Sequence, residues 1–185
     1  MNIKVIDNFI PLQTQNELKD LMIGRDRIFP WFFIPDVTGS GDQNRSAVQH
    51  EFYNLSNGVN SNFLENILPV VKNFNRPDLC VLRANSFLQF PNPDYKQYDT
   101  PHLDMPKYDR SYTIVLYYVC DSEGQTIFFN SKNKVIKKVM PKQGRVAIFD
   151  GSILHTAYQP TKSVRCIINF NINNTFMDNI SSLTI

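Results

Sequence analysis

The stretch Ser111–Phe129, SYTIVLYYVCDSEGQTIFF, holds two runs of β-branched and aromatic residues around a polar segment. The first run ends at Cys120, the second begins at Thr126, and residues 121–125 between them read DSEGQ. Val, Ile, Thr, Tyr and Phe favour strands, whereas Gly, Asp and Ser favour turns. The stretch therefore predicts two β-strands joined by a short connection.

Similar short runs stand on both sides of this stretch, and turn-forming residues separate them. They are CVLRANSFLQF (80–90), KVIKKVM (134–140), RVAIFD (145–150) and VRCIINFNI (164–172). Several short strands at this spacing indicate an antiparallel sandwich or barrel rather than alternating βα units. The sequence contains no GxGxxG motif, no Walker loop and no internal repeat. A nucleotide-binding α/β fold is therefore not indicated.

The first 75 residues have a different texture. Leu18 and Met22 lie four positions apart, and with their apolar neighbours they predict a helix over about residues 11–23. Apolar residues at the same spacing predict a second helix over about residues 61–75, which Pro69 should kink. Between the two, IFPWFFIPD predicts a buried strand; the alternative is an aromatic wall beside a substrate cleft.

Length and composition suit a single domain over residues 1–185, since 42% of the residues are apolar. Nineteen basic residues stand against 17 acidic ones, for a net charge of +2. The densest basic group is the sparse set in residues 132–138, which is typical of a solvated strand face. Nucleic acid is therefore not expected as a partner.

The sequence also bears on the cellular compartment. No apolar run approaches the roughly 20 residues of a membrane span, and the N-terminal MNIKVIDNFI lacks the pattern of a secretory signal. Cys80, Cys120 and Cys166 form no CxxC pair, and each lies in an apolar run. We expect buried, reduced thiols in a soluble cytoplasmic protein. The sequence carries no signal for the oligomeric state.

The segment PHLDMP, residues 101–106, contains one of only three histidines in the chain. In extended backbone, residues two apart project to the same side, so His102 and Asp104 can approach one point. His155, in GSILHTAYQ at the edge of a predicted strand, is a candidate third ligand because strands distant in sequence are often neighbours in a barrel. Two histidines and a carboxylate suit Fe(II) with open coordination positions. Zinc accepts the same set, so the ligands alone leave the metal open.

Arg165 lies ten residues after His155, inside the apolar run VRCIINFNI. A buried arginine needs an anionic partner, and its planar guanidinium matches a carboxylate with two parallel hydrogen bonds. If Arg165 faces inward, Asn169 and Asn171 share its face, and a dicarboxylate co-substrate is the expected partner. The alternative is a solvent-facing ion pair. The third histidine, His50, has no acidic neighbour at plus two, and we expect a structural role for it.

These residues together resemble the 2-oxoglutarate/Fe(II)-dependent dioxygenases, most closely the prolyl-4-hydroxylase-like branch. Ser111–Phe129 resembles that branch's strand, turn and Gly-Gly-Glu/Gln-Thr-x-Phe segment, with Glu123 in place of one glycine. PKQGRVAIFD followed by LHTAYQP resembles its P…G…F…H…P stretch. VIDNFIP and FPWFF near the N-terminus are similar to members encoded by phages of marine bacteria, which would place the protein in the host cytoplasm.

The resemblance implies a mainly β fold, a cupin-like double-stranded β-helix or jelly roll. Helices within about 11–75 would support a core over about 78–172. His102, Asp104 and His155 would be the catalytic metal ligands for Fe(II), and 2-oxoglutarate and O2 would be the co-substrates. The distal carboxylate of 2-oxoglutarate would pair with two residues, Arg165 and Tyr118. Phe90 replaces a second family tyrosine, so that hydroxyl is missing, and Asn85 is a candidate for the pocket wall.

The implied reaction is hydroxylation of an unactivated C–H bond, with decarboxylation of 2-oxoglutarate to succinate and CO2. The leading substrate is a prolyl or other amino-acid side chain, in a peptide, protein or small molecule. A nucleobase-oxidising, demethylase-type dioxygenase and a non-catalytic jelly-roll binding module are the alternatives. The loops expected to choose the substrate are 38–46, 91–101 and 105–110.

Overall fold

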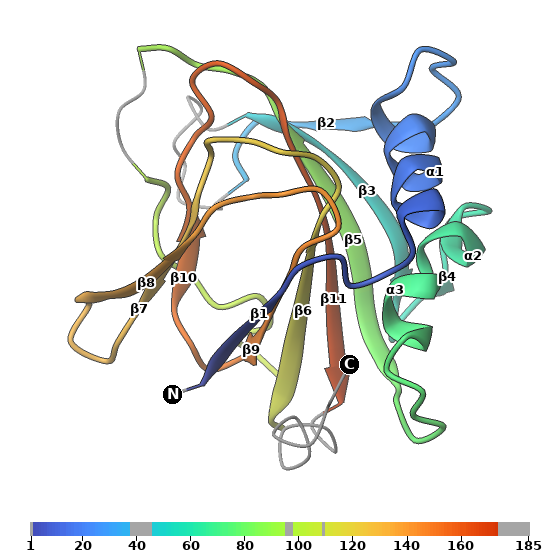
Figure 1. Ribbon diagram of the computed structural model, residues 1–185. Helices are drawn as coiled ribbons and strands as arrows, with labels where there is room; N and C mark the ends of the chain where they lie inside the picture. The colour runs from blue at the N-terminus through green and yellow to red at the C-terminus, as the bar shows by residue number, and fades with distance from the viewer. Residues whose placement is uncertain (1, 38–45, 95–97, 109, 174–185) are drawn as a thin grey trace.

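The computed structural model describes residues 2–37, 46–94, 98–108 and 110–173 (Figure 1). Strands dominate, and three helices lie in the N-terminal part. In chain order the elements are β1 (Ile3–Ile6), α1 (Leu12–Ile23), β2 (Phe32–Ile34), β3 (Ala47–Asn54), β4 (Gly58–Val59), α2 (Leu64–Ile67), α3 (Pro69–Lys72), β5 (Val81–Gln89), β6 (Tyr112–Tyr118), β7 (Thr126–Phe129), β8 (Val135–Val139), β9 (Val146–Asp150), β10 (His155–Ala157) and β11 (Arg165–Asn173).

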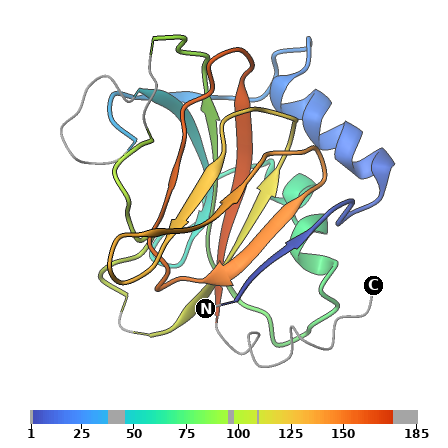
Figure 2. The same ribbon diagram turned by 60° about the vertical axis from the view of Figure 1, so that its left-hand side comes forward.

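Two antiparallel sheets form the framework. The large sheet has the order β1-β9-β6-β11-β5-β3-β2, with β4 paired to β3, and the small sheet has the order β10-β7-β8. The small sheet lies opposite the large one, and the chain passes repeatedly between the two (Figures 1 and 2). Ser111–Phe129 supplies a central strand of the large sheet, β6, and the central strand of the small sheet, β7. The predicted antiparallel jelly roll is confirmed.

The strand β11 lies in the middle of the large sheet and is buried on both faces. Because side chains alternate along a strand, one face of β11 packs against the layer of helices and the other faces the space between the two sheets. Ile168 and Phe170 pack in the apolar core beneath the helices, whereas Ile167 packs in the core between the sheets. The inter-sheet face also carries Arg165 and Asn169. One strand thus combines a stabilising face with a polar face.

The helices cover the outer face of the large sheet beside β3 and β5 (Figure 1). The helix α1 ends at Gly24, as predicted, with Pro11 at its N-cap. The single kinked helix predicted over 61–75 is instead two four-residue helices, α2 and α3, which meet at Leu68. Pro69 has no backbone N–H to donate to the preceding turn, so the helix stops there and starts again.

The N-terminal part contributes strands as well as helices to the structure. β1 forms one edge of the large sheet by pairing with β9, and β2 and β3 extend its other edge beyond β5. The prediction of a buried strand around β2 is wrong, because Phe32 and Phe33 are 62% and 70% exposed on this three-residue edge strand. Only Ile34 of that strand lines the internal cavity described below.

The cysteine prediction holds in part. Cys120 and Cys166 are buried free thiols, but Cys80 is exposed, because it precedes β5 and lies outside the sheet. Within the described residues, no helix is long and apolar enough to cross a membrane.

We expect Phe170→Ala to destabilise the protein by about 3–5 kcal/mol, because its side chain is fully buried where β11 meets the helices. Chemical denaturation monitored by circular dichroism measures this loss. The matched control is Phe33→Ala on the exposed edge strand, with an expected change within about 0.5 kcal/mol. Equal losses for the two variants would contradict the assignment of the core.

Candidate metal and co-substrate site

Two histidines far apart in sequence meet as a backbone pair. His102 N–H donates to the His155 carbonyl at 3.0 Å, and His155 N–H donates to the His102 carbonyl at 3.2 Å. The segment that carries His102 thereby extends the small sheet alongside β10, and Tyr98 pairs with Tyr158 further along the same segment. Directly opposed residues on antiparallel strands project to the same side. Sheet register therefore brings the two imidazoles together, with ring centroids 4.9 Å apart.

The tautomer of each imidazole follows from its second nitrogen. His102 Nδ1 lies 3.2 Å from the Thr100 carbonyl, and His155 Nδ1 lies 3.0 Å from the Ile153 carbonyl. A carbonyl oxygen only accepts, so both Nδ1 atoms carry the proton and both Nε2 atoms keep a lone pair. Asp104 Oδ1 lies 3.7 Å from His102 Nε2 and 3.4 Å from His155 Nε2. The three ligand atoms lie within 4.8 Å of one another, as one metal ion requires.

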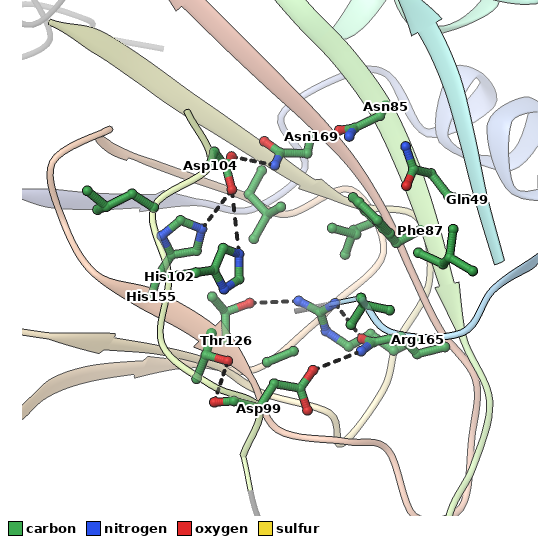
Figure 3. Close-up of a pocket in the computed structure, with 18 of the residues that line it drawn as sticks. Gln49, Asn85, Phe87, Asp99, His102, Asp104, Thr126, His155, Arg165 and Asn169 are labelled. Carbon is green, nitrogen blue, oxygen red and sulfur yellow. Dashed lines mark hydrogen bonds and ion pairs between the residues drawn. The ribbon is translucent and has the colours of Figure 1, made fainter. Parts of the chain in front are cut away.

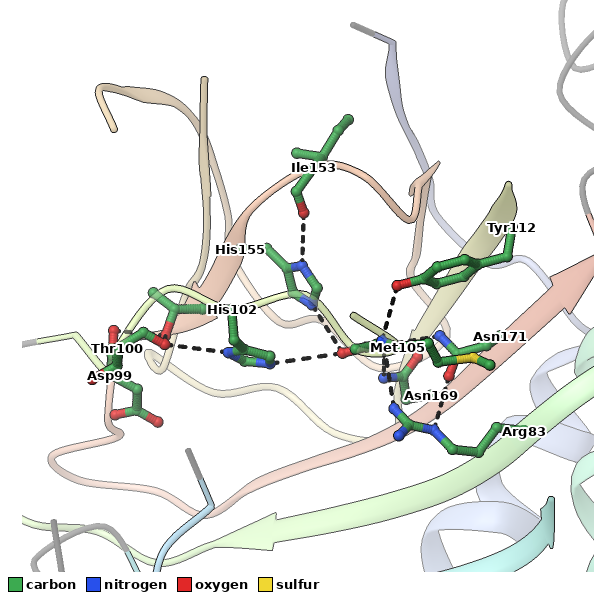
Figure 4. Close-up of polar contacts among 12 residues, drawn as sticks. Arg83, Asp99, Thr100, His102, Met105, Tyr112, Ile153, His155, Asn169 and Asn171 are labelled. Carbon is green, nitrogen blue, oxygen red and sulfur yellow. Dashed lines mark hydrogen bonds and ion pairs between the residues drawn. The ribbon is translucent and has the colours of Figure 1, made fainter. Parts of the chain in front are cut away.

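The other oxygen of Asp104 is held by side chains of β11 and β5. Figure 4 shows these side chains, Asn169, Asn171 and Arg83, close together. Asp104 Oδ2 accepts from Asn169 Nδ2 at 2.7 Å and from Asn171 Nδ2 at 2.9 Å, with Arg83 Nη2 at 3.7 Å. Burial alone raises the pKa of Asp104, but the positive charge of Arg83 and the hydrogen bond from Asn171 act in the opposite direction, and that pKa lies well below its usual value. Asp104 is therefore a fixed carboxylate whose Oδ1 faces the two imidazoles.

Arg165 faces inward, as predicted, and is only 4% exposed (Figure 3). Its Nε donates to the Gly124 carbonyl at 2.9 Å, Nη1 to Gln89 Oε1 at 2.8 Å and Nη2 to Thr126 Oγ1 at 3.0 Å. A guanidinium has five N–H groups, so these three contacts leave one N–H on each terminal nitrogen. That remaining pair matches the two oxygens of a carboxylate.

A buried carboxylate lies on the far side of Gln89. Gln89 Nε2 donates to Asp99 Oδ2 at 3.5 Å, and Gln159 Nε2 donates to Asp99 Oδ1 at 3.0 Å. Because a carboxylate only accepts, Asp99 fixes the amide of Gln89 with its oxygen toward Arg165. Burial lowers the pKa of Arg165, and the negative charge of Asp99 works against that shift. Arg165 is thus held as a cation before any co-substrate arrives.

Other residues named from the sequence take different positions. The Tyr118 hydroxyl donates to Thr126 Oγ1 at 2.8 Å, so Tyr118 lies one contact behind Thr126, which lines the cavity. Phe90 is 53% exposed at the end of β5, and Asn85 lines the cavity as expected. His50 is buried among aromatic rings, and its nitrogens contact the Pro30 carbonyl and Ser61 Oγ. Its expected structural role agrees with these contacts.

Glu123, at the position of the replaced glycine, anchors the loop that leads into β11. Its carboxylate accepts from the backbone N–H groups of Thr161, Lys162 and Ser163 and from Ser163 Oγ. The next residue, Gly124, lies so close to Arg165 that a Cβ there would stand 2.9 Å from Arg165 Cδ. The turn after β6 therefore affects Arg165 in two ways: Glu123 fixes the loop that precedes it, and Gly124 leaves room for its side chain.

The metal-ligand group and Arg165 line one cavity of about 380 Å³ between the sheets. The sequence indicated the histidines, Asp104 and Arg165, but gave no signal for the roles of Gln89 and Asp99. Thr126 appeared only as part of a motif. Of the loops expected to choose the substrate, residues 38–45, 95–97 and 109 lie outside the described residues.

Comparison with known proteins places this site within a described family model. Residues 86–173 match the family described as "2OG-Fe(II) oxygenase superfamily". No curated protein matches the chain.

Solved structures share the fold. An oxidoreductase of the 2OG-Fe(II) oxygenase family from Burkholderia pseudomallei has 12% identity and a TM-score of 0.70, covering 92% of this chain and 85% of its own. The viral collagen prolyl hydroxylase of Paramecium bursaria Chlorella virus-1, solved with 2-oxoglutarate, has 16% identity and a TM-score of 0.60, with 93% and 95% covered. A prolyl hydroxylase from Trichoplax adhaerens, in complex with a hypoxia inducible factor peptide, has 16% identity and a TM-score of 0.59, with 92% and 83% covered. At these identities the likeness is one of fold.

We expect Glu123→Gln to destabilise the protein by about 1 kcal/mol at neutral pH, because a neutral amide accepts more weakly from the loop. Burial raises the pKa of Glu123, but hydrogen bonds from Ser163 and Lys162 outweigh burial and lower that pKa from an ordinary 4.5 to about 2. A lowered carboxyl pKa stabilises the fold above the ordinary value and loses that contribution as pH falls toward 2.

Denaturation at pH values between 7 and 2 tests this expectation. The difference between wild type and Glu123→Gln should shrink as pH falls from 4.5 to 2. Asp26→Asn, an exposed site on the same protein, is the matched control with no expected difference. A constant difference across this range would show that the Glu123 charge does not hold the loop.

Proposed function

We propose that this chain, whose residues 86–173 match the 2OG-Fe(II) oxygenase superfamily, hydroxylates an amino-acid side chain, free or within a peptide. Enzymes of this superfamily use Fe(II), 2-oxoglutarate and O2, and the protein is a dioxygenase of that kind. Residues 1–185 act as one catalytic domain in this proposal, since strands from the N-terminal part complete the same large sheet.

We propose that His102, Asp104 and His155 are the iron ligands. The observation that carries this assignment is the convergence of two unprotonated Nε2 atoms and one fixed carboxylate oxygen within 4.8 Å. Backbone carbonyls orient both imidazoles from behind, as is usual for metal-binding histidines. Three protein ligands leave positions open for the co-substrate and oxygen.

Arg165 and Thr126 would bind the distal carboxylate of 2-oxoglutarate. In support, Arg165 keeps two N–H groups for an acceptor, and both residues line the same cavity as the three proposed ligands. When bound together, iron and 2-oxoglutarate supply the oxidation: one oxygen atom of O2 enters succinate as CO2 leaves, and the other enters a C–H bond. The chain itself binds and orients the co-substrate in this cavity.

Two substitutions separate the two halves of this assignment. We expect Asp104→Ala to abolish binding of Mn(II), a redox-inert stand-in for Fe(II), and with it all succinate formation, because one ligand is removed. Arg165→Met should leave Mn(II) binding intact but weaken 2-oxoglutarate binding at least about 30-fold, because two charge-assisted hydrogen bonds are lost. Calorimetry of metal and then 2-oxoglutarate binding measures both constants.

The matched control for the second variant is Arg76→Met, which removes an exposed guanidinium paired with Asp78. It should leave both binding constants unchanged. Metal binding retained by Asp104→Ala would reject the ligand assignment, and unchanged 2-oxoglutarate affinity in Arg165→Met would reject the assigned carboxylate partner.

Asn171 should act on the metal through Asp104. We expect Asn171→Ala to weaken Mn(II) binding about 10- to 100-fold, because Asp104 Oδ2 loses a donor that fixes the carboxylate. Asn173→Ala, two residues further along β11, is the control, because its side chain contacts Cys80 and Asp78 rather than Asp104. Equal metal affinity of the two variants would remove Asn171 from the positioning of the site.

A further inference from the structure

The cavity has two polar ends, and the proposed co-substrate uses only one of them. Arg165 lies at one end, and Asn85 and Asn169 lie at the other, with the proposed metal ligands alongside (Figure 3). Arg165 and Asn169 are four residues apart on β11, or about 13 Å at about 3.3 Å per residue. The end lined by Asn85 and Asn169 is therefore available for the molecule that is oxidised.

The amide of Asn169 has one possible orientation. Its Nδ2 donates to Asp104 Oδ2 at 2.7 Å, and a carboxylate cannot donate in return. Its Oδ1 must therefore point away from Asp104. That oxygen is buried, on a residue only 4% exposed, and has no hydrogen-bond partner among the described residues. Buried acceptors in folded proteins are nearly always satisfied, so this oxygen indicates a ligand with a hydrogen to donate.

A second acceptor of the same kind stands beside it. Asn85 on β5 is directly opposite Asn169 on β11, and its Oδ1 is also buried without a hydrogen-bond partner in the described part of the chain. Side chains opposed in this way have Cβ atoms about 5 Å apart. Both oxygens can thus reach one nitrogen atom of a ligand.

We propose that the substrate presents a nitrogen with two N–H donors to Asn85 and Asn169, and that these residues place it beside the metal. This inference rests on the proposed oxygenase function and names the chemistry of its substrate. The nitrogen is the ammonium of a free amino acid or the NH2 of a side-chain carboxamide. A proline within a peptide is disfavoured, because its ring nitrogen carries no hydrogen.

The charge at this end agrees with both sources. Arg83 lines the cavity, donates from Nε to Asn171 Oδ1 at 2.9 Å and lies 3.7 Å from Asp104. A neutral carboxamide carries no charge to oppose Arg83, and a free amino acid brings a carboxylate together with its cation. A ligand with only positive charge would be repelled by Arg83.

Binding to the protein loaded with Mn(II) and 2-oxoglutarate tests the proposal without turnover. The ammonium probes are L-proline, N-methyl-L-proline and N-acetyl-L-proline, which carry two, one and no hydrogens on nitrogen. The carboxamide probes are N-acetyl-L-glutamine and its side-chain N,N-dimethylamide. We expect the affinity in at least one series to fall about ten-fold for each hydrogen removed. The series that responds identifies the source of the nitrogen.

Two substitutions of Asn85 assign the effect to this residue. Asn85→Leu removes the acceptor and should weaken the best probe about ten-fold while leaving Mn(II) and 2-oxoglutarate binding unchanged. Asn85→Asp keeps an acceptor and should bind the ammonium probe at least as tightly as wild type. Asn66→Leu, the same change at an exposed position on α2, is the control with no expected effect.

The outcomes that overturn the proposal are distinct from those that overturn the proposed function. Failure to bind Mn(II) and 2-oxoglutarate would refute the oxygenase site itself. With both bound, affinities that ignore N-methylation, or the absence of binding in both series, would refute the N–H requirement. An equal loss in Asn85→Asp and Asn85→Leu would show that Asn85 acts as a donor, which also contradicts the proposal.

Discussion

The candidate site depends on one backbone pairing, the reciprocal hydrogen bonds between His102 and His155 at 3.0 and 3.2 Å. These two bonds join a connecting segment to β10 and fix its register. A shift of one residue would turn His102 to the opposite side of the segment and separate the imidazoles. Asp104 then reaches the same point because it lies two residues further along. The geometry of the proposed metal centre is therefore a property of sheet register.

The polar inner face of β11 is the second feature that sets this protein apart from an ordinary jelly-roll core. Arg165, Asn169 and Asn171 are all buried between the sheets, where unpaired polar groups are costly. Contacts within the protein use three N–H groups of Arg165, on Gly124, Gln89 and Thr126, and the amide nitrogens of Asn169 and Asn171, on Asp104. The apolar outer face of the same strand supplies the packing that holds these groups in place.

Much of this architecture could be predicted from the sequence, because the side chains of a strand point alternately to its two faces and this alternation can be read from neighbouring residues. The inward face of Arg165 and the approach of His102 to Asp104 both follow from a period of two residues. The wrong predictions concern burial, which depends on how the sheets and helices stack on one another. β2 is an exposed edge strand, and Cys80 lies outside the sheet. Gln89 and Asp99 could not be identified, because glutamine and aspartate in a strand or loop are common and their contacts are long-range.

The sequence by itself determined which chemical groups are present and on which face of a strand each one lies. It thereby indicated two histidines, a carboxylate and a buried guanidinium, in an order that resembles the 2OG-Fe(II) oxygenases. Only the tertiary structure decided which atoms of those groups remain available. Carbonyls two residues earlier in the chain occupy both Nδ1 atoms. Hydrogen bonds with distant segments occupy one oxygen of Asp104 and three N–H groups of Arg165. What is left uncommitted, including the oxygens of Asn85 and Asn169, defines what the cavity can bind, because each polar atom has a limited number of hydrogen bonds to give.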